Sequence, residues 1–226
     1  MQTVPVRFCV LAFFVACASI APVPPCGAEA GTPLRFAQAG SGGADLADRA
    51  EARLRAGDFE GAIALLEGPA AEHPNDFRVN VVYSLALLRK CADQKAKGDP
   101  AYRKLVHTPY RIGGRLAQIN RTRPEPYHIV GWALVINERP YKGLRWLKKA
   151  LYYDGDNATY WALFGDACVD YAEAEKHRAA RGHSATSTNV RRFYREAESA
   201  YQKALGFAGE DRKLKAEVNA RLSALP

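Results

Sequence analysis

The acidic side chains and the single histidine within residues 166–177 have the types and spacing that could support chemistry. Asp166 and Asp170 share one face of a predicted helix near Glu173, and His177 follows Glu173 by four residues. Paired carboxylates can serve as acid and base, and a Glu–His pair on one helix face can contribute two ligands to a metal. Helix surfaces carry such pairs routinely, so we interpret them as surface charges.

Known catalytic and metal-binding motifs are missing from the sequence. The histidines at 73, 107, 128, 177 and 183 have no metal-ligand spacing with cysteine. There is no G-x-S-x-G element, phosphate-binding loop or dinucleotide fingerprint. We therefore expect no enzyme activity, no catalytic residue, no metal and no cofactor.

Two glycines in matching surroundings lie 34 residues apart. The two segments read Tyr127-x2-Val130-Gly131-x2-Leu134 and Trp161-x2-Phe164-Gly165-x2-Cys168. The chain resembles the tetratricopeptide repeat (TPR) family, a helix–turn–helix unit of this period with the pattern W-x2-L-G-x2-Y. The resemblance implies an all-α, right-handed α-solenoid of about four helix pairs plus a C-terminal capping helix. It also implies a concave groove, lined by the first helices, for partner peptides or helices.

The N-terminal 43 residues are expected to lie outside this fold. Residues 8–20 are almost wholly apolar after Arg7, and Ala28-Glu29-Ala30 is a small-residue cleavage site, so residues 1–30 read as a secretory signal peptide. Residues 31–43 read as a flexible leader. In an alternative interpretation, residues 14–17 form a lipobox and Cys17 is lipidated.

The helical domain is expected over residues 44–226. We place repeats at about 44–76, 77–123, 124–157 and 158–209, and a cap at 210–226. Pro69 should break or kink the second helix of the first repeat near Gly68. Asp99-Pro100 and Thr108-Pro109 pair an N-cap residue with a proline, which predicts a short helix at 100–107 and another at 109–120. Insertions are therefore expected at 96–108 and 172–191.

Two cysteines remain once residues 1–30 are set aside. Cys91 and Cys168 fall on the predicted first helices of the second and fourth repeats. Stacking places such helices about 16–20 Å apart, whereas a disulfide needs Cα atoms within about 7 Å. We expect two free, buried thiols.

Family geometry predicts which side chains face the groove. That surface is largely apolar, which favours an amphipathic helix or an extended apolar segment as the ligand. The groove residues that the resemblance implies are Val81, Leu85, Leu88, Arg89, His128, Trp132, Val135, Ile136, Ala162, Asp166, Val169 and Asp170. They could instead be internal packing residues, or be covered by the leader.

The formal charge of +8 arises from one segment. Residues 101–150 hold eleven basic and two acidic residues, whereas the rest of the chain is nearly balanced. This basic segment is either a solvated helix surface or a docking patch for an anionic partner. Its cations are Arg103, Lys104, Arg111, Arg115, Arg121, Arg123, Arg139, Lys142, Arg145, Lys148 and Lys149.

Together these features favour a non-enzymatic scaffold or adaptor of the bacterial cell envelope, exported to the periplasm. The groove would hold a segment of another envelope protein, with the basic segment helping to orient it. One alternative is a pilotin-type outer-membrane lipoprotein that escorts a secretion or pilus component. Another is a binder of anionic envelope glycan or lipid. Nucleic acid is not an expected partner.

Overall fold

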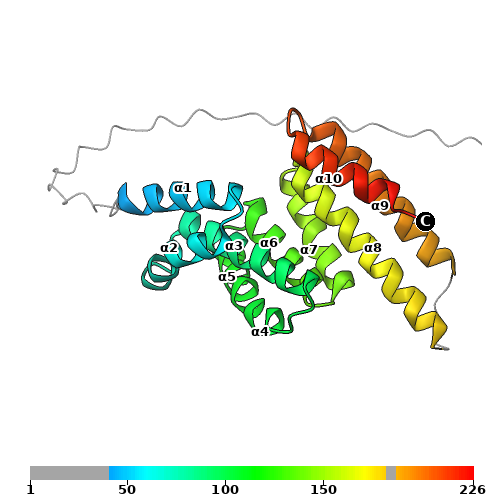
Figure 1. Cartoon of the computed structure of the whole chain (residues 1–226), viewed down its shortest axis with the longest axis horizontal. Coiled ribbons are helices and arrows are strands. Elements are labelled where there is room, and N and C mark those ends of the chain that lie inside the picture. The colour runs from blue at the N-terminus through cyan, green and yellow to red at the C-terminus, as the bar shows by residue number, and fades with distance from the viewer. Residues whose placement is uncertain (1–40, 182–186) are drawn as a thin grey trace, which may run out of the picture. The chain divides into compact units, whose positions relative to one another are not determined.

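The computed structural model describes residues 41–181 and 187–226, and every regular element in these ranges is a helix. The helices follow one another in chain order (Figure 1). They are α1 (Ser41–Arg55), α2 (Phe59–Glu72), α3 (Phe77–Ala96), α4 (Tyr102–Leu105), α5 (His107–Ile119), α6 (Pro124–Ile136), α7 (Pro140–Tyr153), α8 (Ala158–Ala180), α9 (Ser187–Phe207) and α10 (Arg212–Ser223). The signal peptide and residues 31–40 of the leader lie outside the described residues.

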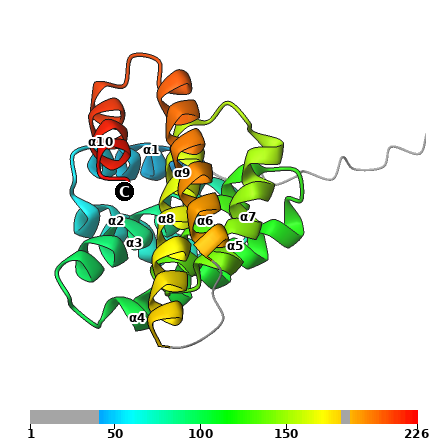
Figure 2. The ribbon, with the colours of Figure 1, turned by 90° about the vertical axis from the view of Figure 1, so that its right-hand side faces the viewer.

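The helices pair as TPR-like hairpins, so the predicted fold class is confirmed. The pairs are α1 with α2, α3 with α5, α6 with α7, and α8 with α9, and α10 packs against α9 as a terminal cap. The long pair α8 and α9 runs side by side in both Figure 1 and Figure 2. Each first helix also contacts the next pair, which makes the stack continuous from α1 to α10.

Side-chain caps set the starts of four helices. Asp58, Asp76, Asn157 and Asp211 each accept a hydrogen bond from the backbone N–H three residues on. These caps satisfy donors that would otherwise lack a partner in the first helical turn. Prolines begin α6 and α7, where the missing N–H costs nothing.

Small residues let the later hairpins close tightly. A Cβ on Gly131 would lie 2.7 Å from Leu147 Cγ, and one on Gly143 would lie 2.9 Å from the Gly131 carbonyl oxygen. These distances are shorter than any side chain could accept without movement, so α6 and α7 require glycine at both positions.

Three local expectations are wrong. The helix α2 does not break near Gly68 but runs through Pro69 to Glu72, because the loss of one N–H donor at Pro69 does not stop the residues after it from completing the last turn. The final turn is closed by the His73 N–H, which donates to the Pro69 carbonyl at 2.9 Å. The helix α1 begins at Ser41, so its first turn takes in residues placed in the leader.

The third correction concerns Thr108, which is not an N-cap. It lies in the first turn of α5, and only Val106 separates α5 from α4. The helix α4 is a single turn that starts near the predicted extra helix, after Asp99 accepts a hydrogen bond from the Ala101 N–H at 2.9 Å. The insertion therefore forms one helical turn, α4, that leads almost directly into α5, and it does not form two separately capped helices.

The buried core divides into two main clusters. The first joins α1 to α6, and the second joins α6 to α10. Trp132 on α6 packs against both clusters from a half-buried position. Cys91 belongs to the first cluster and Cys168 to the second, and both are free and fully buried, as predicted.

Candidate functional site

Two neighbouring hollows lie along the first helices of the hairpins. The first, the α6 hollow, has a volume of about 570 Å³ and is lined by α3, α6, the start of α8, the α1–α2 turn and the start of α10. The second, the α8 hollow, has a volume of about 610 Å³ and is lined by the ends of α3 and α6, by α8 and α9, and by the C-terminal residues. Trp132 lines both hollows, and we call the two together the groove.

His128 is buried in the wall of the α6 hollow. It is 5% exposed, and its ring centre lies 4.6 Å from that of Tyr160 and 5.7 Å from that of Trp132. Burial, and then the charge of Arg89, lowers the pKa of His128 to about 3, so the imidazole is neutral near pH 7. Its Nε2 has no hydrogen-bond partner among the described residues.

Glu125, one helical turn before His128, also lines the α6 hollow. Its Oε1 accepts a hydrogen bond from Arg123 at 2.9 Å, whereas its buried Oε2 has no partner in the described chain. Buried polar atoms in native proteins normally have a partner. Two such atoms in one hollow therefore mark it as a place where a ligand could supply hydrogen bonds.

Arg89 lies over Trp132 where the two hollows meet. Its guanidinium carbon is 5.1 Å from the centre of the Trp132 ring, a distance at which a cation and an aromatic face attract. The Arg89 side chain is exposed as a whole, but its position in the hollow partly removes the guanidinium from water, which lowers its pKa; Glu217 opposes that shift from α10 across the α6 hollow. No described acidic group lies within ion-pair distance of Arg89, although the residue stays charged at any ordinary pH.

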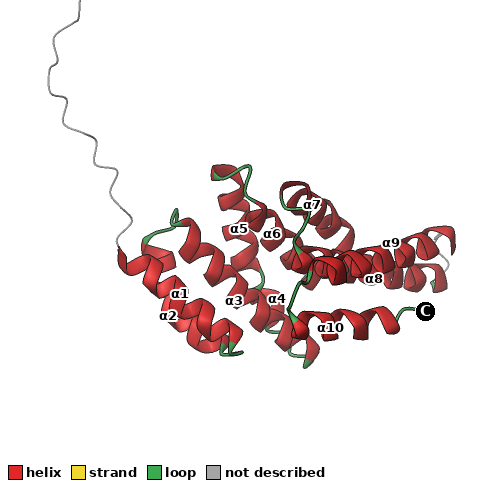
Figure 3. Ribbon diagram, turned by 90° about the horizontal axis from the view of Figure 1, so that it is seen from above, coloured by secondary structure: helices red, strands yellow, loops and turns green. Residues whose placement is uncertain are grey.

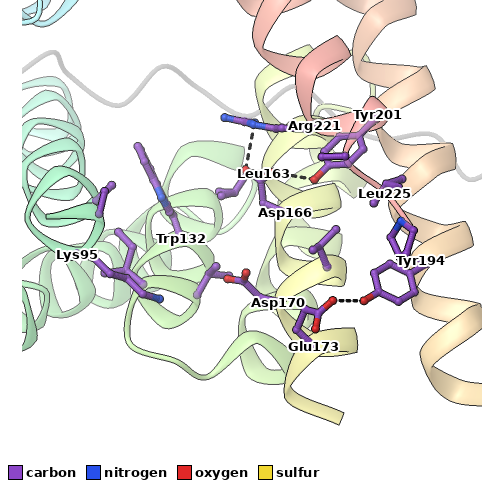
Figure 4. Close-up of a pocket in the computed structure, with 17 residues that line it drawn as sticks. Lys95, Trp132, Leu163, Asp166, Asp170, Glu173, Tyr194, Tyr201, Arg221 and Leu225 are labelled. Atoms are coloured by element: carbon purple, nitrogen blue, oxygen red, sulfur yellow. Dashed lines mark hydrogen bonds and ion pairs between the residues drawn. The ribbon is translucent and has the colours of Figure 1, made fainter. Parts of the chain in front are cut away.

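Three acidic residues of α8 line the second hollow (Figure 4). Asp166 accepts a hydrogen bond from the Tyr201 hydroxyl at 2.8 Å and pairs with Arg221 at 3.1 Å. Burial raises the pKa of Asp166, and Arg221 opposes the shift. Glu173 accepts a hydrogen bond from the Tyr194 hydroxyl, whereas Asp170 faces the hollow opposite Lys95.

The structure brings most of the predicted groove residues to these hollows. Leu85, Arg89, His128 and Trp132 line the α6 hollow. Trp132 also lines the α8 hollow, together with Val135, Ile136, Asp166, Val169 and Asp170. Val81, Leu88 and Ala162 line neither and are core residues, at 8%, 0% and 2% exposure.

Sequence reasoning missed the contribution of α10 and α9 to the groove. Leu214, Glu217 and Arg221 come from α10, which was expected only to cover the last apolar surface. Tyr194 and Tyr201 come from α9, a second helix. The pattern of α10 predicts its buried face, but nothing in the sequence pairs Arg221 with Asp166.

None of the eleven cations of the basic segment lines either hollow, although His128 and Trp132 of the same segment do. Most are exposed on α4, α5 and α7 or on the turns beside them. Arg115 differs because it turns inward and donates a hydrogen bond to Asn80 Oδ1 at 3.0 Å. Figure 3 places α5 and α7 on one side of the stack and α10 on the other.

Residues 41–181 and 187–226 hold no group of three or more His, Cys, Asp and Glu side chains that could bind a metal ion. Glu173 is bonded to Tyr194 and Lys176, which supports the surface-pair interpretation over a shared metal with His177. His183 lies outside the described residues. In the described helices we find no stretch of sufficient length and apolarity to cross a bilayer.

Comparison with known proteins gives structural neighbours only. The thermophilic TPR protein TTC0263 of Thermus thermophilus is 19% identical, with 80% of this chain and 99% of that chain covered and a TM-score of 0.48. MamA is 16% identical over 77% of this chain and 90% of that chain, with a TM-score of 0.41. No family model matches the chain, and no curated protein matches it. The TPR-like assignment therefore rests on the residues and on the hairpin stack itself.

Proposed function

We propose that this chain is a binding scaffold whose groove holds a segment of another protein. The observation that carries the proposal is the α6 hollow, where the unpartnered Nε2 of His128 and Oε2 of Glu125 lie beside the exposed Arg89. These groups could bind the N–H and C=O groups of a partner backbone. Trp132, between the two hollows, would be the apolar anchor.

The partner fits as an amphipathic helix or an extended apolar segment. The α8 hollow continues from the first hollow and combines Val135, Ile136 and Val169 with the carboxylate of Asp170. A segment that follows the groove would therefore meet an apolar and partly acidic surface after passing Trp132. A side chain that is apolar along its stem and basic at its end would suit that surface.

We also propose that the protein acts outside the cytoplasm, as a periplasmic adaptor or assembly factor of the bacterial envelope. The apolar residues 8–20, followed by Ala28-Glu29-Ala30, support export. The partner is then sought among envelope proteins. The cations of the basic segment, which line neither hollow, would contribute to the approach of the partner rather than to its recognition.

Truncating Trp132 tests the proposed groove. We expect Trp132→Ala to weaken capture of the envelope partner by roughly thirtyfold, because anchor residues are worth about 2 kcal/mol or more. Capture is measured with the immobilised full-length chain, and circular dichroism checks that the variant is folded.

Trp161→Ala is the matched control. Trp161 is also half-buried with a cation over its ring, Lys203 at 4.1 Å, but it lines neither hollow of the groove. Arg89→Met keeps the aliphatic stem of an exposed residue and is a second groove variant with little risk to folding. Full capture by folded Trp132→Ala and Arg89→Met would contradict the proposal.

A further inference from the structure

The exposed face of α7 has an unusual composition. At about 100° per residue, its exposed side chains fall within roughly 120° of the helix circumference. The opposite face is buried through Gly143, Leu144, Leu147 and Ala150. The exposed residues are Tyr141, Lys142, Arg145, Lys148, Lys149 and Tyr152, and α7 contains no acidic residue.

The helix α5 repeats this composition on a smaller scale. It too lacks acidic residues, and it exposes Tyr110, Arg111 and Ile119. Four of the five large hydrophobic side chains that are exposed in the described chain lie on these two helices, and the fifth, Phe207, ends α9. The first helices α1, α3, α6 and α8 expose none. The exposed rings are thus gathered on α5 and α7, beside the cations of these two helices.

The cations of α7 are free to meet an external anion. None of the four has an ion-pair partner among the described side chains, and the ammonium groups of Lys148 and Lys149 lie 5.7 and 4.3 Å from the ring centres of Phe164 and Tyr127. A hollow of about 650 Å³ beside Lys148 and Tyr152 adds Arg192, Arg195 and Lys203 from α9. One acid, Glu196, lies in that hollow and pairs with Arg192 at 3.5 Å.

We propose that the outer face of α7, with the adjoining parts of α5 and α9, docks on an anionic lipid surface. Lysine and arginine bind acidic headgroups, and tyrosine rings prefer the boundary between headgroups and acyl chains. Tyr141 and Tyr152 stand about 16 Å apart along the helix axis, with the cations between them. Headgroups can meet such cations one by one, whereas a protein partner needs a continuous apolar centre, which this face lacks.

This docking is peripheral and independent of the groove. The membrane would hold the protein by its second helices, which leaves the hollows along the first helices open to a partner. The two activities can therefore fail separately in experiments.

Vesicle co-sedimentation of the full-length chain tests the proposal. We expect binding to phosphatidylcholine vesicles that contain phosphatidylglycerol, at least tenfold tighter than to phosphatidylcholine alone, and weakened by salt. Each cation near an anionic surface contributes about fivefold, so Arg145→Gln with Lys148→Gln should weaken binding by roughly 25-fold. Tyr141→Ser with Tyr152→Ser should remove the binding that persists at high salt.

The control pair is Arg181→Gln with Arg212→Gln, which changes net charge equally at exposed sites off this face. It should leave vesicle binding within about twofold of the unaltered chain. Equal losses in both pairs would overturn the proposal, because net charge alone would then explain binding. So would the lack of any preference for phosphatidylglycerol. Salt-sensitive binding to soluble poly-glutamate without binding to the anionic vesicles would show that this face docks an acidic protein instead.

Discussion

The second hairpin and the two later hairpins solve the same packing problem with different chemistry. Counted from the N-cap residues of α3, α6 and α8, the fourth position holds Asn80, Tyr127 and Trp161. The eighth position holds Ser84, Gly131 and Gly165. The register is the same in all three helices, but α3 carries polar residues where the others carry an aromatic and a glycine.

In the later hairpins the glycine lets the second helix approach. Gly131 lies under Leu147, and Gly165 lies against the ring of Tyr201. In α3 the same space is filled by a hydrogen-bonded group instead. Asn80 Nδ2 donates to the carbonyls of His73 and Asp76, and the Ser84 hydroxyl donates to the Asn80 carbonyl at 2.7 Å.

The same two helix positions can therefore hold either an aromatic residue and a glycine or two polar residues, provided that the buried polar groups all have hydrogen-bond partners. Asn80 and Ser84 are completely buried, so each needs its partners. The partner of Asn80 Oδ1 is Arg115 from α5, at 3.0 Å. One cation of the basic segment is thereby used inside the fold.

We expect a substitution at the glycine of a later hairpin to destabilise the fold more than a substitution in the polar group of the second hairpin. A Cβ at Gly165 would lie 2.4 Å from Tyr201 Cε1, and Tyr201 is itself held by Asp166. We expect Gly165→Ala to lower the free energy of unfolding by about 3 kcal/mol, the upper range for overpacking. Urea denaturation measures the change.

Gly114→Ala is the control for that variant, because Gly114 is a helical glycine with open space around its Cα. It should raise stability by roughly 0.5–1 kcal/mol through helix propensity. If both alanines act alike, the close approach of α8 and α9 is not what requires glycine at position 165.

The hydrogen-bonded group around Asn80 should lose stability when the Arg115 guanidinium is removed. Arg115→Leu leaves Asn80 Oδ1 buried without a partner, and we expect a loss of about 2 kcal/mol in unfolding free energy. Arg111→Leu, one turn earlier on α5, removes an exposed cation with the same change in net charge and should stay within about 0.5 kcal/mol of the unaltered chain. Equal effects of the two would show that Arg115 does not stabilise the second hairpin.

The fifth position of these helices includes one titratable residue, which makes the stability of the third hairpin depend on pH. It holds Val81 in α3, Ala162 in α8 and His128 in α6. Because the folded pKa of His128, about 3, lies below its usual 6.5, the unfolded chain takes up a proton first as the pH falls. The stability that neutral His128 contributes is full above about pH 6.5 and is lost progressively toward pH 3.

Between about pH 7 and pH 5.5 this linkage should cost roughly 1 kcal/mol. Thermal unfolding of the unaltered chain and of His128→Leu at both pH values measures it, with the pH dependence of the leucine variant as the reference. An equal loss in both proteins would mean that His128 is already protonated, or accessible to solvent, in the fold.

The sequence predicts the hairpin stack because its strongest signals are local and periodic. The spacing of Gly131 and Gly165 in matching surroundings is such a signal, because it can be read without any contact between distant residues. The continuity of α2 through Pro69 was not predictable from the local rule, because the proline removes one N–H bond at any interior position and the rule does not say where the helix ends. That end depends on the His73 carbonyl, which is held by Asn80 of the next hairpin.

The site was less predictable than the fold because it combines distant segments. Family geometry placed Arg89, His128 and Trp132 at the groove, and all three line it. It also placed Leu88 there, which is fully buried, because the same helix face packs against its neighbours before it reaches the hollow. The ion pair of Arg221 with Asp166 and the inward turn of Arg115 depend on contacts that only the folded chain creates.

The two buried cysteines allow the opening of each half of the molecule to be measured separately. Burial raises the pKa of Cys91 to about 11 and that of Cys168 to about 12, so neither thiol is ionised or reachable while its surroundings stay closed. The rate at which each thiol is alkylated therefore measures how often α3 or α8 separates from its core cluster. Unequal rates would mean that the second and fourth hairpins open independently, and matched rates would mean that the stack opens as one unit.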